Sequence, residues 1–151
     1  MEEIDFKRNA RKEGVILSTI FNSEEKCVRK STLISNLVNE RAAVSASEAN
    51  GFVDSTLEKK LIVLREYDYD RVYYLTKLGA YEYLFSCDHN LFRKIYSVFN
   101  GTGYDPTSVE EFISMKCYRM YLDDEEINLD TLLEEYQAYA KREFNRLHLQ
   151  N

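Results

Sequence analysis

Short polar side chains line one face of a helical pattern over residues 45–61, the second of two consecutive helical patterns. Ser47 and Asn50 lie on its outer face, opposite the apolar residues Phe52 and Val53. Hydroxyl and amide groups can form hydrogen bonds with base edges in the major groove of DNA. The same pattern is also typical of an ordinary helical hairpin with a solvated face.

Basic side chains flank this pattern in the sequence. Lys30 and Arg41 border the preceding helix, and Arg65 and Arg71 lie in the extended run that follows. Cations at such positions can bind phosphates, which gives affinity that does not depend on base sequence. The residues predicted to contact DNA are Arg29, Lys30, Ser31, Arg41, Ser45, Ser47, Asn50, Arg65 and Arg71.

Two short helices and a two-stranded ribbon would position these side chains. Apolar residues recur at helical spacing over residues 31–39 and 45–60, which predicts a helix in each segment. Apolar residues alternate over residues 62–75, which predicts two half-buried strands. The polar turn at residues 67–71 separates them, and residues 27–29 fit a short additional strand.

Helix caps can be assigned from the same sequence. Ser31 is predicted to cap the first of the two helices, because its hydroxyl can accept from a free backbone N–H. Ser45 and Glu48 have the spacing of a capping box. Thr107 or Ser108 is predicted to cap a later helix in the same way.

The segment from Leu57 to Arg65, the pair Asp70–Arg71 and the run from Tyr74 to Gly79 together resemble the wing region of MarR-like and PadR-like winged-helix regulators. The resemblance covers about the first 90 residues and includes the Leu-Thr-x-x-Gly motif after the ribbon. It implies a winged helix-turn-helix in which Arg71 approaches the minor groove. The chain departs from the family pattern where Lys60 replaces the glycine that often precedes the first wing strand.

The overall prediction is a mainly α fold with a small β-hairpin wing, followed by C-terminal helices. The 151-residue chain is 44% hydrophobic, which suits a globular core. We expect a winged-helix domain over residues 1–99, a Gly- and Pro-containing loop over 100–107 and a helical extension over 108–151. Residues 1–94 hold 15 basic and 15 acidic side chains, so the net charge of −6 comes from residues 95–151.

The last helical pattern carries apolar residues at spacings of three and four, which is typical of helix pairing. This stripe can pack on the first helix of the same chain or on a second subunit. The residues predicted to form a two-fold dimer interface are Leu133, Tyr136, Ala140 and Phe144.

Enzyme chemistry, metals and cofactors have little support in the sequence. The only histidines, His89 and His148, lie far apart without ligand spacing. The cysteines, Cys27, Cys87 and Cys117, lack a C-x-x-C motif and are expected to be thiols, of which Cys27 is the candidate for redox sensing. No apolar run approaches the roughly 20 residues that span a bilayer, so a cytoplasmic protein is expected.

Two functions fit these patterns. The first is a homodimeric transcriptional regulator that binds double-stranded DNA with one recognition helix in each major groove. The alternative is a winged-helix module that binds a protein partner, such as a phage- or plasmid-encoded inhibitor or an assembly factor. In that case Tyr67, Tyr69 and Tyr73 would dominate the interface, since buried rings dominate protein contacts.

Overall fold

The computed structural model describes residues 2–149, and it describes the side chains of residues 11–148. The chain divides into two compact units, Met1–Ser86 and Cys87–Asn151. Over the described residues the fold is mainly α, with seven helices and one small three-stranded antiparallel sheet. This confirms the predicted mainly α fold with a small β wing.

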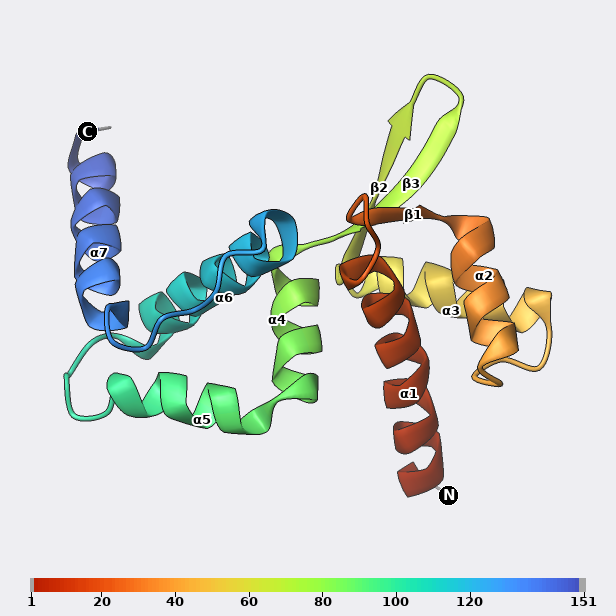
Figure 1. The fold of residues 1–151 in the computed structure, drawn as a ribbon, viewed down its shortest axis with the longest axis horizontal. Coiled ribbons are helices and arrows are strands. Elements are labelled where there is room, and N and C mark those ends of the chain that lie inside the picture. The colour runs from red at the N-terminus through yellow and green to blue at the C-terminus, as the bar shows by residue number, and fades with distance from the viewer. Residues whose placement is uncertain (1, 150–151) are drawn as a thin grey trace. The chain divides into compact units, whose positions relative to one another are not determined.

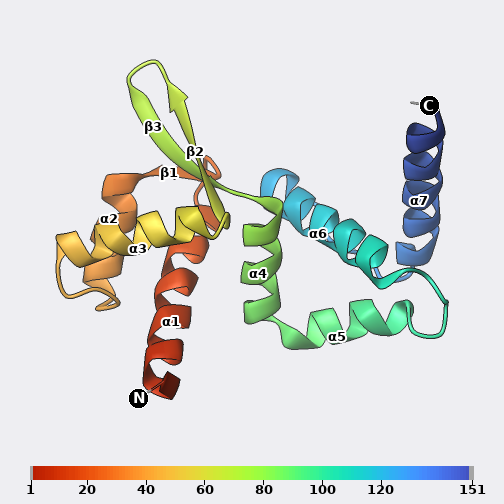
Figure 2. The ribbon, with the colours of Figure 1, turned by 180° about the vertical axis from the view of Figure 1, so that it is seen from behind.

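The first unit has the element order of a winged helix-turn-helix. Three helices precede or separate the strands, the hairpin follows the third helix, and a fourth helix begins directly after it (Figures 1 and 2). The sheet order is β1-β3-β2, with both strand pairs antiparallel. The elements are α1 (Glu2–Phe21), β1 (Cys27–Arg29), α2 (Lys30–Asn39), α3 (Ala46–Glu58), β2 (Ile62–Tyr67), β3 (Asp70–Leu75) and α4 (Lys77–Cys87).

The core of the first unit lies where α1, α2, α3 and the base of the sheet meet. Period-four and period-three spacing places the apolar side chains of each helix on one inward face, and alternation does the same in the strands. Both figures show the β2–β3 hairpin extending beyond these helices, so its tip has no core beneath it. The fully buried apolar residues of this core include Ile16, Ile20, Leu33, Leu37, Ala49, Val53, Ile62 and Leu75.

The Leu-Thr-x-x-Gly motif fixes the start of α4 to the start of the wing. The hydroxyl of Thr76 donates to the carbonyl oxygen of Lys60 at 2.6 Å and accepts from the N–H of Gly79 at 3.0 Å. The backbone N–H of Thr76 donates to the carbonyl oxygen of Leu61 at 3.1 Å. A Cβ on Gly79 would lie 2.0 Å from that same oxygen, so only glycine fits at this close approach.

Lys60 occupies a backbone position that favours glycine. Its φ angle is 62°, in the left-handed region, directly after the end of α3. Helices commonly end on a glycine in this conformation because a side chain there is strained. Lys60 therefore adopts a left-handed turn that glycine would adopt without strain.

Two of the predicted caps differ from the structure. Arg29, not Ser31, is the N-cap of α2, and it makes no side-chain capping bond, because β1 runs directly into the helix. Asp105, not Thr107 or Ser108, caps the helix that begins at Pro106: the Asp105 carboxylate accepts from the N–H of Ser108 at 3.1 Å. Proline suits the first helical position, so the helix begins earlier than predicted.

The second unit consists of three helices around a cluster of aromatic rings. Tyr136 lies at its centre, with ring centroids 5.4 Å from Phe99, 5.5 Å from Phe112 and 4.7 Å from Tyr104. These contacts join α5 to the later helices, and the compact units divide between Ser86 and Cys87. The helices are α5 (His89–Val98), α6 (Pro106–Asp123) and α7 (Leu132–Leu149).

Over the described residues, no helix combines the length and the apolar character needed to cross a membrane.

Candidate nucleic-acid interface

The outer face of α3 presents the polar side chains that the sequence predicts. Ser47 is exposed and Asn50 is half-buried, while Ala49 and Val53 are buried on the opposite face. Ser45 caps the helix: its hydroxyl oxygen accepts from the N–H of Glu48 at 3.1 Å. Ser45 therefore has a structural role at this helix end, and Ser47 and Asn50 are the side chains available to a partner.

The cation at the start of α2 is paired with a carboxylate of α3. Lys30 Nζ lies 3.0 Å from Asp54 Oδ1. The amide nitrogen of Asn50 lies 3.5 Å from the other oxygen, Asp54 Oδ2. Lys30 and Asn50 therefore lie close together because both contact Asp54. Asp54 was not among the residues predicted to contact DNA. Ser31, the next residue of α2, is exposed.

The arginines beside the wing are paired as well. Arg29 Nη2 lies 2.9 Å from Asp70 Oδ1, and Arg71 Nε lies 3.2 Å from Glu66 Oε1. Glu66 and Arg71 are directly opposite each other in the β2–β3 ladder, so the pairing follows from the register. Each pair is largely solvent-exposed, so each contributes little to stability and a phosphate can compete for the cation.

Two of the candidate cations have no ion-pair partner among the described residues. Arg65 is exposed on β2, and Arg41 is exposed in the turn after α2 with a φ of 59°. A left-handed backbone at an arginine is strained. Of the predicted cations, these two are the ones whose charge is not offset by a neighbouring carboxylate.

The two wing arginines lie on opposite faces of the ribbon. Arg65 is opposite Val72 in the ladder, and Arg71 is the residue before Val72. Adjacent residues of a strand point to opposite faces, so Arg65 and Arg71 cannot both contact one surface laid flat on the ribbon. Arg29 is also opposite Val72, across the other edge of β3, and so shares the face of Arg65.

The face of the sheet that carries Arg29 and Arg65 also holds a polar cluster around Cys27. Cys27 is paired with Tyr74 across β1 and β3. A hydrogen bond with the Cys27 thiol, and a further one with the Tyr67 hydroxyl, raise the pKa of Tyr74 above its ordinary value of 10.0. The candidate redox thiol therefore lies beside tyrosine hydroxyls rather than beside cations.

The predicted dimer residues of α7 are divided between core and surface. Tyr136 is 3% exposed, and its hydroxyl donates to Ser108 Oγ at 3.1 Å, so it packs within its own chain. Leu133 and Ala140 are half-buried. Phe144 is 61% exposed, which leaves it as the clearest apolar contact for a partner.

The sequence did not indicate which acidic residues pair with the predicted cations. Asp54, Glu66 and Asp70 each lie within ion-pair distance of a predicted DNA-binding cation. The signal that could have identified the wing pairs was the ladder register, since cross-strand partners can be counted from the turn. The Lys30–Asp54 contact joins two helices, and a sequence without a fold does not indicate it.

Among the described residues, no group of three or more histidine, cysteine or acidic side chains could hold a metal ion. No family model, curated protein or solved structure matches this chain.

Proposed function

We propose that the chain is a sequence-specific regulator that binds double-stranded DNA through α3 of its first unit. The observation that carries the proposal is the exposed outer face of α3, with Ser47 and Asn50, in a helix-turn-helix followed by a β wing. In this arrangement the second helix of the motif enters the major groove. The resemblance of the wing segment to MarR-like and PadR-like regulators supports the same conclusion.

The test is a comparison of binding to a selected duplex and to random duplexes. Replacing Asn50 with alanine removes an amide that can bind an adenine edge, so discrimination should fall by about 1–3 kcal/mol while affinity for random duplexes stays similar. Ser55→Ala is the matched control, because Ser55 is an exposed residue of α3 that does not lie on the face that carries Asn50. Equal discrimination in wild type and Asn50→Ala would exclude base recognition by this residue.

Two copies of the chain would bind two half-sites, and we place their contact on α7. Phe144 and Leu147 are both more than half exposed on this helix and can pair with a second copy. Phe144→Ser should then shift the protein toward monomer in sedimentation, whereas a wild-type protein that is already monomeric would exclude the dimer.

A second candidate function is binding of a protein partner through the wing. Tyr69 at the wing tip is fully exposed, and Tyr67 beside it is 56% exposed. Exposed aromatic rings commonly provide the energetically dominant contacts of protein interfaces. Three of the five candidate DNA-binding cations are paired with carboxylates, which also favours this alternative. Tyr69→Ala should then abolish partner capture and leave DNA binding unchanged.

A further inference from the structure

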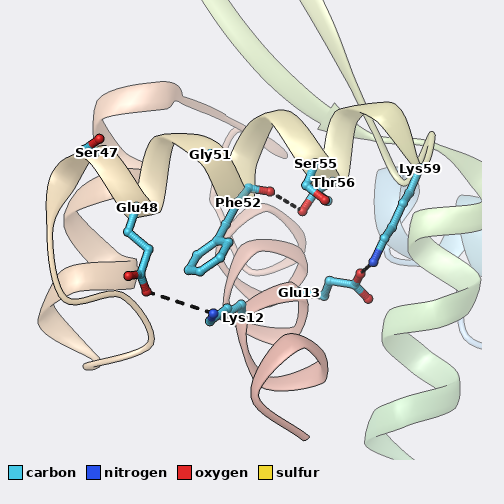
Figure 3. Close-up of a pocket in the computed structure, with 9 residues that line it drawn as sticks. All are labelled: Lys12, Glu13, Ser47, Glu48, Gly51, Phe52, Ser55, Thr56 and Lys59. Carbon is cyan, nitrogen blue, oxygen red and sulfur yellow. Dashed lines mark hydrogen bonds and ion pairs between the residues drawn. The ribbon is translucent and has the colours of Figure 1, made fainter. Parts of the chain in front are cut away.

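A groove lies between α1 and the flank of α3 that does not carry Asn50 (Figure 3). Its volume is about 370 Å³, within the range of pockets that hold small molecules. Lys12 and Glu13 line it from α1, and Glu48, Gly51 and Phe52 are among the residues that line it from α3. Of the residues proposed to contact DNA, Ser47 also lines this groove and Asn50 does not.

The ammonium of Lys12 is held in the groove with little access to solvent. Lys12 is 7% exposed, and its Nζ lies 3.5 Å from the centroid of the Phe52 ring. Its nearest carboxylate oxygen, Glu48 Oε1, is 4.0 Å away, which is longer than a hydrogen bond. This contact is a long ion pair, and no described residue accepts a hydrogen bond from the ammonium.

Glu48, in turn, lacks a hydrogen-bond donor for one of its carboxylate oxygens. Its Oε1 is buried and receives no hydrogen bond from the described residues. The side chain as a whole is 31% exposed, so the carboxylate still reaches the groove. Figure 3 shows Glu48, Phe52 and Lys12 pointing toward one another between the two helices. An acceptor for Lys12 and a donor for Glu48 are therefore needed side by side.

The rest of the groove is electrically balanced and open at its centre. At the other end Glu13 and Lys59 form an ion pair, so the four charged side chains sum to zero. Gly51 lines the groove with bare backbone, and a Cβ built there meets nothing within 4 Å. A neutral occupant avoids the larger desolvation cost of a charged one.

We propose that this groove binds a small neutral molecule that carries an amide group on a flat apolar ring. The amide carbonyl accepts from the ammonium of Lys12, and the amide N–H donates to the carboxylate of Glu48. The ring packs against Phe52 and the backbone at Gly51. An anionic analogue can pair with Lys12 but supplies no donor to Glu48, and a cationic analogue can pair with Glu48 but supplies no acceptor to Lys12, so the amide alone satisfies both.

The test titrates benzamide, benzoate and benzylamine into the full-length protein and follows backbone amide resonances. Benzamide should shift the resonances of residues 12 and 48–52 in a saturable way. Benzoate and benzylamine should bind at least tenfold more weakly. In Gly51→Leu the new side chain occupies the groove, so benzamide binding should weaken at least tenfold. The thermal midpoint of this variant should be no lower than that of wild type, because leucine favours helix more than glycine does.

Gly14→Leu is the matched control, since Gly14 is a helical glycine of α1 with no neighbour within 4 Å of its Cβ and does not line the groove. It should bind benzamide as wild type does. The proposal is overturned if benzamide does not bind wild type, if Gly51→Leu binds it as tightly, or if benzoate binds as well as benzamide. None of these results depends on DNA binding.

Discussion

Replacing Gly79 with alanine tests how the first unit is held together. The new Cβ would lie 2.0 Å from the carbonyl oxygen of Leu61, whereas real Cβ contacts essentially never fall below 3.0 Å. The backbone must therefore move by about 1 Å, which strains the bond from the Thr76 N–H to that oxygen. Overpacking costs about 1–3 kcal/mol.

The damaged hydrogen bond costs about 1–3 kcal/mol more, and the gain in helix propensity returns about 1 kcal/mol. The net loss of unfolding free energy should be about 3 kcal/mol, measured by urea denaturation followed by circular dichroism. Gly14→Ala is the control, because the same substitution meets nothing within 4 Å there and should stabilise by about 0.5–1 kcal/mol. The reasoning is refuted if both variants change stability in the same direction.

Three further substitutions or reactions test separate parts of the structure. Lys60→Gly should raise the unfolding free energy by about 0.5–1 kcal/mol, because it relieves a left-handed lysine; a loss of stability would contradict the assigned φ of 62°. Burial raises the pKa of the Cys117 thiol to about 12, so at pH 8 it stays protonated, and iodoacetamide should label exposed Cys87 but not Cys117. Equal labelling of both thiols in the folded protein would show that Cys117 is not buried. Tyr136→Phe removes the bond to Ser108 and should cost about 0.5–1.5 kcal/mol in urea denaturation, with no change in sedimentation; a monomer–dimer shift would place Tyr136 at an interface instead.

Local patterns were sufficient to predict the elements of the first unit. The spacing of Leu33 and Leu37 predicts α2, and the alternation from Ile62 to Leu75 predicts the wing, because both elements bury one face on a single core. The cap at Ser45 was also predictable, since it depends on residues three apart.

The remaining features depend on contacts between distant segments. The stripe on α7 predicts Leu133 as a buried residue, but Leu132 is the residue that is fully buried, since α6 and the aromatic cluster determine which face turns inward. No local pattern around Lys12 indicates that Phe52, 40 positions away, covers it. Likewise, the charge count near α3 does not indicate that Asp54 binds Lys30.

The salt dependence of duplex DNA binding tests the proposed function most directly. Each phosphate neutralised contributes about −0.9 to the slope of log K against log salt. Contacts by Arg41 and Arg65 alone would give a slope of about −2 per chain, and contacts by all five candidate cations about −4.5. Asp54→Asn frees Lys30 and should strengthen binding and steepen the slope, whereas the same change at Asp123, an exposed residue of the second unit, should affect both less.

The wild-type protein should give a slope of about −2 or steeper, and Asp54→Asn should give a steeper slope than wild type. Binding that is undetectable at low salt in both proteins, or affinity that does not change with salt, would contradict DNA recognition and leave the partner-binding wing as the function to pursue.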